Sequence, residues 1–233
     1  MKREAGLQKQ LRGKATPKST SRRRRSQGRP SPSAAVGQKG LIAAVREGLK
    51  TTPPGELTFL QISKLAGVDQ RLIRYYFKEF PDLLRAAAVE IMQELRTSFA
   101  VAHRQDGSPR ERMHRHVKVF FALFGDNPHY HRLVVDYLIT KQGTDRDASL
   151  NGWRQSIKEF ETILNEARQA NGLRPMDARL AHVMSAALCE FLFSAKPVFL
   201  SLFGQQADSS AFQNQYCDLI VDLLMGTTSE ESR

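Results

Sequence analysis

Residues 57–77, with the sequence LTFLQISKLAGVDQRLIRYYF, decide how the chain is interpreted. Thr58 and Gln61 have the spacing of a capping box, which predicts a helix that begins directly after Thr58. Gly67 stands where this helix would end, at a position that favours positive φ and therefore glycine. Asp69 is a good N-cap for a second helix. The stretch therefore predicts two short helices joined by a tight turn, the arrangement of a helix-turn-helix.

The two predicted helices each have an inner face, and the second also has a distinctive outer face. The residues expected inside are Ile62, Leu65 and Ala66 in the first helix and Leu72, Ile73, Tyr76 and Phe77 in the second. The outer face of the second helix carries Arg71, Arg74, Tyr75 and Lys78. Arginine binds guanine bidentately or holds a phosphate, and tyrosine offers a hydroxyl and a flat ring. This face predicts a probe for the DNA major groove; the alternative is a solvated helix that binds no ligand.

The neighbourhood of this motif, residues 40–88, resembles the tetracycline-repressor (TetR) family of bacterial regulators. The strings Ile62–Val68 (ISKLAGV) and Leu72–Phe77 (LIRYYF) look like the family's IAxxAGV and LIRYHF strings. An amphipathic helix that contains Leu41 and Val45 precedes them, and Pro81–Leu84 opens a long helix after them. The resemblance implies that residues 70–77 form a recognition helix.

The resemblance implies phosphate contacts at Thr58 and Tyr75, and the outer face of the second helix predicts further DNA contacts. Bases or adjacent phosphates are expected at Gln70, Arg71, Arg74 and Tyr75, and the DNA backbone at Thr58, Tyr76 and Lys78. Two positions depart from the family. Phe80 stands where a phosphate-holding lysine is usual, and Arg71 replaces a frequent small residue. The base preference therefore cannot be transferred from relatives.

The positive charge of the chain is concentrated at its N-terminus. The formal net charge is +11, and residues 1–36 contain 11 Lys/Arg but only one acid, Glu4. Residues 37–80 contain seven cations and four acids, whereas residues 81–233 contain 17 cations and 19 acids. A small positive head on a nearly neutral body suits a DNA-binding protein whose body does not contact DNA.

Residues 1–36 are rich in Arg, Lys, Ser, Pro and Gly and have hardly any large apolar residue. Such a segment cannot bury enough surface to offset its ordering entropy, so we expect a disordered basic tail. One interpretation is an arm that follows phosphates or enters a minor groove. The alternatives are a tolerated tail or a start codon placed too far upstream. A transit peptide would need an apolar stripe that this segment lacks.

The rest of the sequence predicts an all-α protein of about nine helices. Helical periodicity and two further N-terminal signals, Ser108–Glu111 and Asn127–Pro128, place helices throughout the body, and the last two are expected at about 177–203 and 209–225. The predicted domains are a three-helix helix-turn-helix DNA-binding domain at 37–80 and a helical effector-binding and dimerisation domain at 81–226. A disordered C-terminal tail is expected at 227–233.

The last two predicted helices carry more apolar surface than a small bundle can cover, which indicates an interface. The candidate interface residues are Leu180, Val183, Ala187 and Leu188 in one helix and Phe212, Tyr216, Leu219, Ile220 and Leu223 in the other. In the family, two such helices per chain pair into a four-helix seam. A homodimer would place two recognition helices about one DNA turn apart, so a palindromic operator is expected. The alternative is that these residues form the core of a monomer.

Aromatic and methionine side chains spread over the body are candidates for an effector pocket. They are Phe120, Phe124, Tyr137, Trp153, Met184 and Phe191. For any one of them plain core packing is an alternative. The resemblance implies that a ligand in the body releases DNA. A mostly apolar or aromatic effector is expected, because no charged constellation indicates another class.

Metal, cofactor and catalytic chemistry are not expected. His114/His116 and His129/His131 have i, i+2 spacing, which points to different helix faces, and His103 and His182 stand alone in the sequence. The sequence has no glycine-rich phosphate loop, nucleophile elbow or zinc-protease string. Catalysis by a helical enzyme is the alternative from a different class.

The compartment is inferred from the cysteines and from apolar segments. Cys189 and Cys217 lie in apolar surroundings and no secretory signal is seen, so two buried thiols in a reducing cytoplasm are expected, with a redox-sensing pair as the alternative. Residues 183–204 are apolar but contain Glu190, Lys196 and Pro197, which favours a buried helix over a membrane span. The sequence thus predicts a cytoplasmic, ligand-released, homodimeric repressor. An activator, or a regulator without an effector, is the runner-up.

Overall fold

The computed structural model of the chain describes residues 36–140 and 142–226, and every regular element in this part is helical. The prediction of an all-α fold is confirmed. The predicted tails fall outside the described residues, except Val36. The α-helices are α1 (Gln38–Leu49), α2 (Phe59–Ala66), α3 (Gln70–Tyr76), α4 (Phe80–Arg104), α5 (Pro109–Asp126), α6 (Tyr130–Val134), α7 (Thr144–Ala170), α8 (Ala178–Ser194), α9 (Lys196–Phe203) and α10 (Ser210–Met225).

The helix-turn-helix is built by the local signals that the sequence contains. The Thr58 hydroxyl accepts a hydrogen bond from the Gln61 amide at 3.3 Å, and the Gln61 side chain accepts one from the Thr58 amide at 2.8 Å. Gly67 ends α2 with a φ of 65°, in the left-handed region that favours glycine. The Asp69 carboxylate caps α3 by accepting the Arg71 amide hydrogen at 2.7 Å. These caps fix where α3 begins relative to α2.

Two residues expected on the inner face lie outside. Leu65 is half exposed, whereas Ile62 on the same helix is fully buried. Tyr76 is 41% exposed, since α3 ends at this residue and the extended backbone of Phe77 turns the Phe77 ring into the core instead. Helix α3 therefore presents two neighbouring tyrosines rather than one.

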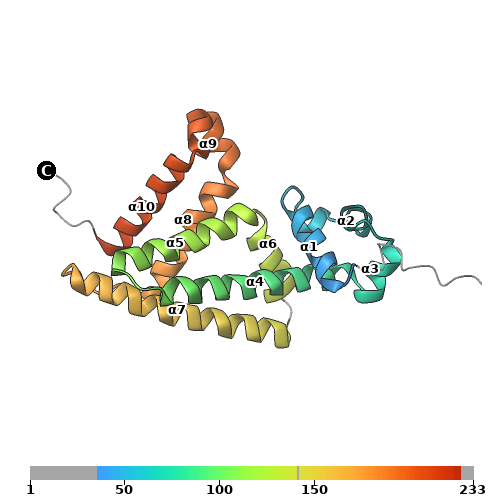
Figure 1. Cartoon of the computed structure of the whole chain (residues 1–233), viewed down its shortest axis with the longest axis horizontal. Coiled ribbons are helices and arrows are strands. Elements are labelled where there is room, and N and C mark those ends of the chain that lie inside the picture. Colours follow the sequence, from blue (N-terminus) through green and yellow to red (C-terminus); the bar gives the residue numbers. More distant parts are fainter. Residues whose placement is uncertain (1–35, 141, 227–233) are drawn as a thin grey trace, which may run out of the picture.

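The long helix α4 joins the helix-turn-helix to the rest of the chain (Figure 1). Its first turns pack against α1, and its later turns pack against α5 and α7. Arg46 of α1 forms ion pairs with Glu94 at 2.6 Å and with Glu90 at 3.5 Å on α4. A displacement of α4 in the body would therefore act directly on the position of α1.

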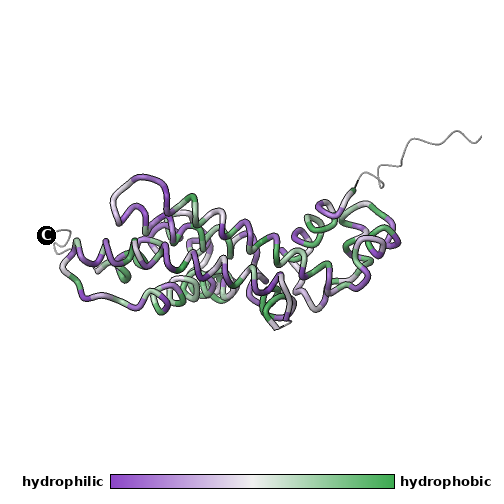
Figure 2. Tube along the Cα trace, turned by 90° about the horizontal axis from the view of Figure 1, so that it is seen from below, coloured by the Kyte–Doolittle hydropathy of each residue, from purple (hydrophilic) through white to green (hydrophobic). Residues whose placement is uncertain are grey.

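The body is a bundle in which α5 lies between α4, α7, α8 and α10. Hydrophilic and hydrophobic residues are interspersed along each helix, as expected for helices with one apolar side and one polar side (Figure 2). The largest fully buried side chains of the body centre are Phe99, Phe120 and Phe160, from α4, α5 and α7. Burial of each such ring contributes about 2 to 3 kcal/mol.

The helix expected over residues 177–203 is broken into two. α8 ends at Ser194, and the segment that starts at Lys196 is bent from it by 65°. Pro197 explains the break, because proline lacks the amide hydrogen that a continuing helix needs but fits the first turn of a new one. Within the described residues no single helix is long and apolar enough to span a membrane, although this bent pair together reaches that length and composition.

Candidate nucleic-acid interface and body cavities

The outer face of α3 is exposed and positively charged. Arg71, Arg74 and Lys78 are all exposed, and Tyr75 is 80% exposed. Within the described ranges none of these three cations forms an ion pair with an acid. Cations without acidic neighbours are free to bind phosphates or base edges.

The other predicted DNA contacts lie at the borders of this face. Thr58 is exposed at the start of α2, Gln70 is half-buried at the start of α3, and Tyr76 is exposed beside Tyr75. The Tyr75 and Tyr76 rings meet edge to face with centroids 5.2 Å apart. The structure thus gathers the predicted residues on α3 and its two flanks. Their contact with DNA stays a prediction.

Two phenylalanines behind this face were not predicted to matter. The guanidinium carbon of Arg74 lies 4.2 Å from the centroid of the Phe59 ring. Phe80 meets the same ring edge to face, with centroids 5.0 Å apart. Phe80, which replaces the lysine expected from the resemblance, is therefore part of an aromatic pair under Arg74. The sequence signal was an aromatic residue at the first position of α2 and again at the first position of α4, the helices on either side of α3.

The six residues proposed for an effector pocket do not share one cavity. Phe120 and Phe124 are core residues, 1% and 5% exposed. Met184 and Phe191 are 39% and 58% exposed, because they lie on the outer side of α8. Tyr137 is half-buried, and Trp153 lines a cavity between α4 and α7 in the described part of the chain. The pocket prediction is therefore revised to the surroundings of Trp153.

That cavity lies between α4 and α7 and has a volume of about 110 Å³. Its wall is apolar at Met92, Phe99 and Trp153, and polar at Arg96 and Asp145. A wider groove of about 500 Å³ runs between α4 and α5, with Arg115 and Lys118 among its lining residues. An apolar wall with one nearby guanidinium suits a small ligand with an apolar body and one polar or anionic group.

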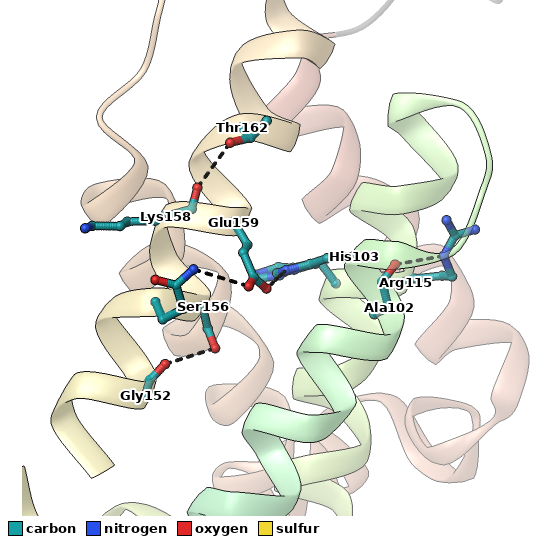
Figure 3. A network of polar contacts seen from close by, with 10 residues as sticks. Ala102, His103, Arg115, Gly152, Ser156, Lys158, Glu159 and Thr162 are labelled. Carbon is teal, nitrogen blue, oxygen red and sulfur yellow. Dashed lines mark hydrogen bonds and ion pairs between the residues drawn. The ribbon is translucent and has the colours of Figure 1, made fainter. Parts of the chain in front are cut away.

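A buried histidine cluster adjoins this cavity, contrary to the expectation that His103 and His182 stand alone. The Nε2 atom of His103 on α4 lies 2.9 Å from Nδ1 of His116 on α5. On α8, His182 accepts the indole hydrogen of Trp153 at 2.9 Å. Figure 3 shows Glu159 reaching from α7 to His103, at 3.4 Å. Sequence spacing could not predict this cluster, because its members come from different helices.

Burial keeps the three imidazoles neutral. Desolvation lowers the pKa of His182 to about 4 and holds the pKa of His116 well below its usual range. The pKa of His103 is lowered by burial as well, although the carboxylate of Glu159 opposes this shift. His116 Nε2 and His182 Nδ1 have no hydrogen-bond partner among the described residues. No group of three or more His, Cys, Asp or Glu in the described ranges is arranged to hold a metal ion.

The two cysteines are buried and unbonded. Burial raises the pKa of both thiols, to about 11 for Cys217 and further for Cys189. A thiol that stays protonated is a poor nucleophile, so nothing here favours the redox-sensing alternative.

The predicted interface residues divide into an exposed set and a packed set. Five of the predicted interface residues on α8 and α10 are exposed, and we call them the α8–α10 face: Leu180, Val183, Ala187, Leu219 and Leu223. Leu188 and Phe212 are half-buried, and Tyr216 donates a hydrogen bond to the Leu188 carbonyl at 3.0 Å. Ile220 is 3% exposed and belongs to the core of its own chain, which corrects its assignment.

Part of the chain matches a model of a known protein family. Residues 109–224 match the model of the tetracyclin repressor-like C-terminal domain. The chain belongs to the tetracycline-repressor family. It is therefore a transcriptional regulator of the helix-turn-helix type, as the sequence resemblance predicts. No curated protein sequence matches this TetR-family regulator closely enough to count as a relative.

Solved structures share the fold at low sequence identity. FadR from Bacillus subtilis in complex with stearoyl-CoA is 18% identical, with a TM-score of 0.57 over 82% of this chain and 98% of that one. A regulatory protein of the tetR family from Rhodococcus RHA1 is 17% identical, with a TM-score of 0.61 over 82% and 97%. AibR in complex with isovaleryl coenzyme A and operator DNA is 12% identical, with a TM-score of 0.62 over 82% and 99%.

Proposed function

We propose that this TetR-family regulator is a homodimeric repressor that binds a palindromic operator through α3 and is released by a small effector in its body. The observation that carries the proposal is the outer face of α3. It presents Arg71, Arg74 and Tyr75 to solvent on a frame that is capped at both helix starts. A rigid helix with unneutralised guanidinium groups is the form of probe that reads a major groove.

We infer that Gln70, Arg71, Arg74 and Tyr75 contact bases or adjacent phosphates. Thr58, Tyr76 and Lys78 flank them and would hold the DNA backbone. The three cations supply counterion release, which gives affinity without sequence preference, whereas base-edge hydrogen bonds supply the preference.

Dimerisation through the α8–α10 face would give the operator its symmetry. The exposed leucines and valine of this face form the kind of apolar surface that a soluble chain covers with a partner. A two-fold interface repeats the same residues on both protomers and thus orients two copies of α3. The expected operator is two inverted half-sites about one DNA turn apart.

The effector is expected in the cavity beside Trp153. Its apolar wall and its single nearby arginine, Arg96, fit an acyl group joined to a polar head. FadR and AibR, which share the fold, are described with bound stearoyl-CoA and isovaleryl coenzyme A. A short acyl thioester suits the small volume of this cavity better than a long one. Because α4 lines the cavity and also packs on α1, occupancy would move the head.

Arg74→Ala is expected to weaken operator binding about tenfold or more per recognition helix, since a guanidinium contact to a base contributes about 1 to 3 kcal/mol. The measurement is a gel-shift titration on an operator selected from random DNA by the wild-type protein. Val101→Ala, an exposed residue of α4 away from α3, is the matched control. Unchanged affinity of Arg74→Ala would remove Arg74 from the binding face.

Isovaleryl-CoA is expected to change the fluorescence of Trp153, the only tryptophan of the chain, and to release the operator. Free coenzyme A should do neither, and stearoyl-CoA should act more weakly. Ser149→Phe is expected to fill the cavity and abolish both responses while operator binding persists. If Ser149→Phe responds like the wild type, the effector site lies elsewhere. If no acyl thioester acts, the effector belongs to another class or the regulator has none.

A further inference from the structure

Three successive helices meet at one aromatic ring behind the recognition face. Phe59 is the first residue of α2, Phe80 is the first residue of α4, and Arg74 lies in the last turn of α3. The Phe59 ring is half-buried. Phe80 closes one side of it, with an interplanar angle of 68° and centroids 5.0 Å apart, and the Arg74 guanidinium carbon lies 4.2 Å from its centroid.

We propose that Phe59, braced by Phe80, is a positioning residue that holds the Arg74 guanidinium in a DNA-reading orientation and thereby sets base preference. The proposal rests on the proposed function, because it assigns Phe59 a role through an arginine that reads DNA. It adds a residue that does not itself contact DNA.

The geometry allows Arg74 to stack and to read at the same time. A guanidinium is planar, and its five N–H donors all lie in that plane. A guanidinium carbon 4.2 Å from the ring centroid is close enough for face-to-face stacking, which would use the face of the group and leave these donors available. Bidentate recognition of a guanine or a phosphate uses the in-plane edge. The ring and the DNA therefore do not compete for the same part of the side chain.

Stacking also reduces the cost of ordering a long side chain. Arginine loses much rotamer freedom when it is fixed at an interface, and pre-organisation before binding removes part of that cost. No acid in the described part of the chain pairs with Arg74, so Phe59 is the contact that restrains the guanidinium. Phe80 in turn restrains Phe59 through the edge-to-face contact between the two rings.

If Phe59 had a purely structural role, removal of its ring would have a different effect from the one that a positioning role predicts. The start of α2 is fixed by the Thr58–Gln61 capping box, and the core contact of α2 is the fully buried Ile62. Loss of the Phe59 ring should therefore leave the helix-turn-helix folded. What it should change is the orientation of Arg74, and with it the discrimination between bases at the position that Arg74 reads.

The test is a double-mutant cycle on the full-length protein. Phe59→Leu keeps an apolar side chain but removes the ring, and we expect operator affinity to fall about threefold per recognition helix, which is about tenfold for two copies. Phe59→Tyr should restore most of the affinity. Phe59→Leu should have little further effect once Arg74→Ala is present, and it should flatten the base preference at the Arg74 position. Leu60→Ala, an exposed neighbour on the same helix, is the matched control.

An NMR measurement without DNA separates this inference from the proposed function. The side-chain protons of Arg74 should be shifted upfield by the ring current of Phe59 in the wild type but not in Phe59→Leu. Additive effects in the cycle, or no ring-current shift, would overturn the positioning role while operator binding stands. A wild-type protein that shows the ring-current shift but binds no DNA in the selection would overturn the proposed function and the reading role with it.

Discussion

A chain that carries Leu219→Asp is expected to be monomeric at micromolar concentration and to keep its helical fold. Leu219 is 66% exposed on α10, so the substitution places the carboxylate in water in a single chain. In a symmetric dimer through the α8–α10 face it would place two carboxylates in an apolar interface. Loss of the leucine contacts and desolvation of two charges would cost about 4 kcal/mol or more, which raises the dissociation constant about a thousandfold. Sedimentation equilibrium measures this change.

Val101→Asp is the matched control, because Val101 is similarly exposed but lies on α4, outside the α8–α10 face. It should leave the mass unchanged. The monomeric Leu219→Asp chain should also lose most of its operator affinity, since each head then binds a half-site alone and the gain from a linked second head disappears. A Leu219→Asp protein that sediments like the wild type would show that another surface holds the dimer.

The helix-turn-helix could be predicted in detail because its signals are local. Thr58 with Gln61, Gly67 and Asp69 each act within three residues of their own position, and each forms the expected cap. Local periodicity also identifies Ile62 and Ile73 as core residues. It fails at Tyr76, because whether the last residue of a short helix points inward depends on the backbone of the residue that follows.

Features that join distant helices could not be read from spacing. The contact of Arg74 with Phe59 and the histidine cluster both join residues of different helices. The outward position of Met184 and Phe191 likewise depends on which side of α8 meets α5. Sequence periodicity shows that a helix has an apolar side, but it does not show whether the chain itself or a partner covers that side.

Stability is expected to fall as the pH falls from about 6.5 to about 4, through the histidine cluster. An unfolded histidine has a pKa of about 6.5, whereas burial lowers the pKa of His182 to about 4 and that of His116 well below the usual range. The unfolded chain therefore binds more protons in this window. The free energy of unfolding is not reduced by these histidines above pH 6.5, and it declines as the pH falls below that value. At pH 5 the imidazole of His182 should remove about 2 kcal/mol, and that of His116 should add to this loss. Urea unfolding at pH 7.5 and 5.0 measures the loss.

The contribution of the cluster can be separated from that of the other titrating groups. Burial lowers the pKa of His103 but the Glu159 carboxylate raises it, so this imidazole should contribute less than the other two. His116→Phe keeps an aromatic ring in a site stacked against Phe99 and Phe160, and it should reduce the loss. His131→Gln, at an exposed position, is the control that should keep the full loss. An identical pH dependence in His116→Phe and the wild type would mean that the buried imidazoles do not govern acid stability. Since a loss of a few kcal/mol is a large fraction of the stability of an ordinary domain, acidification should loosen the body.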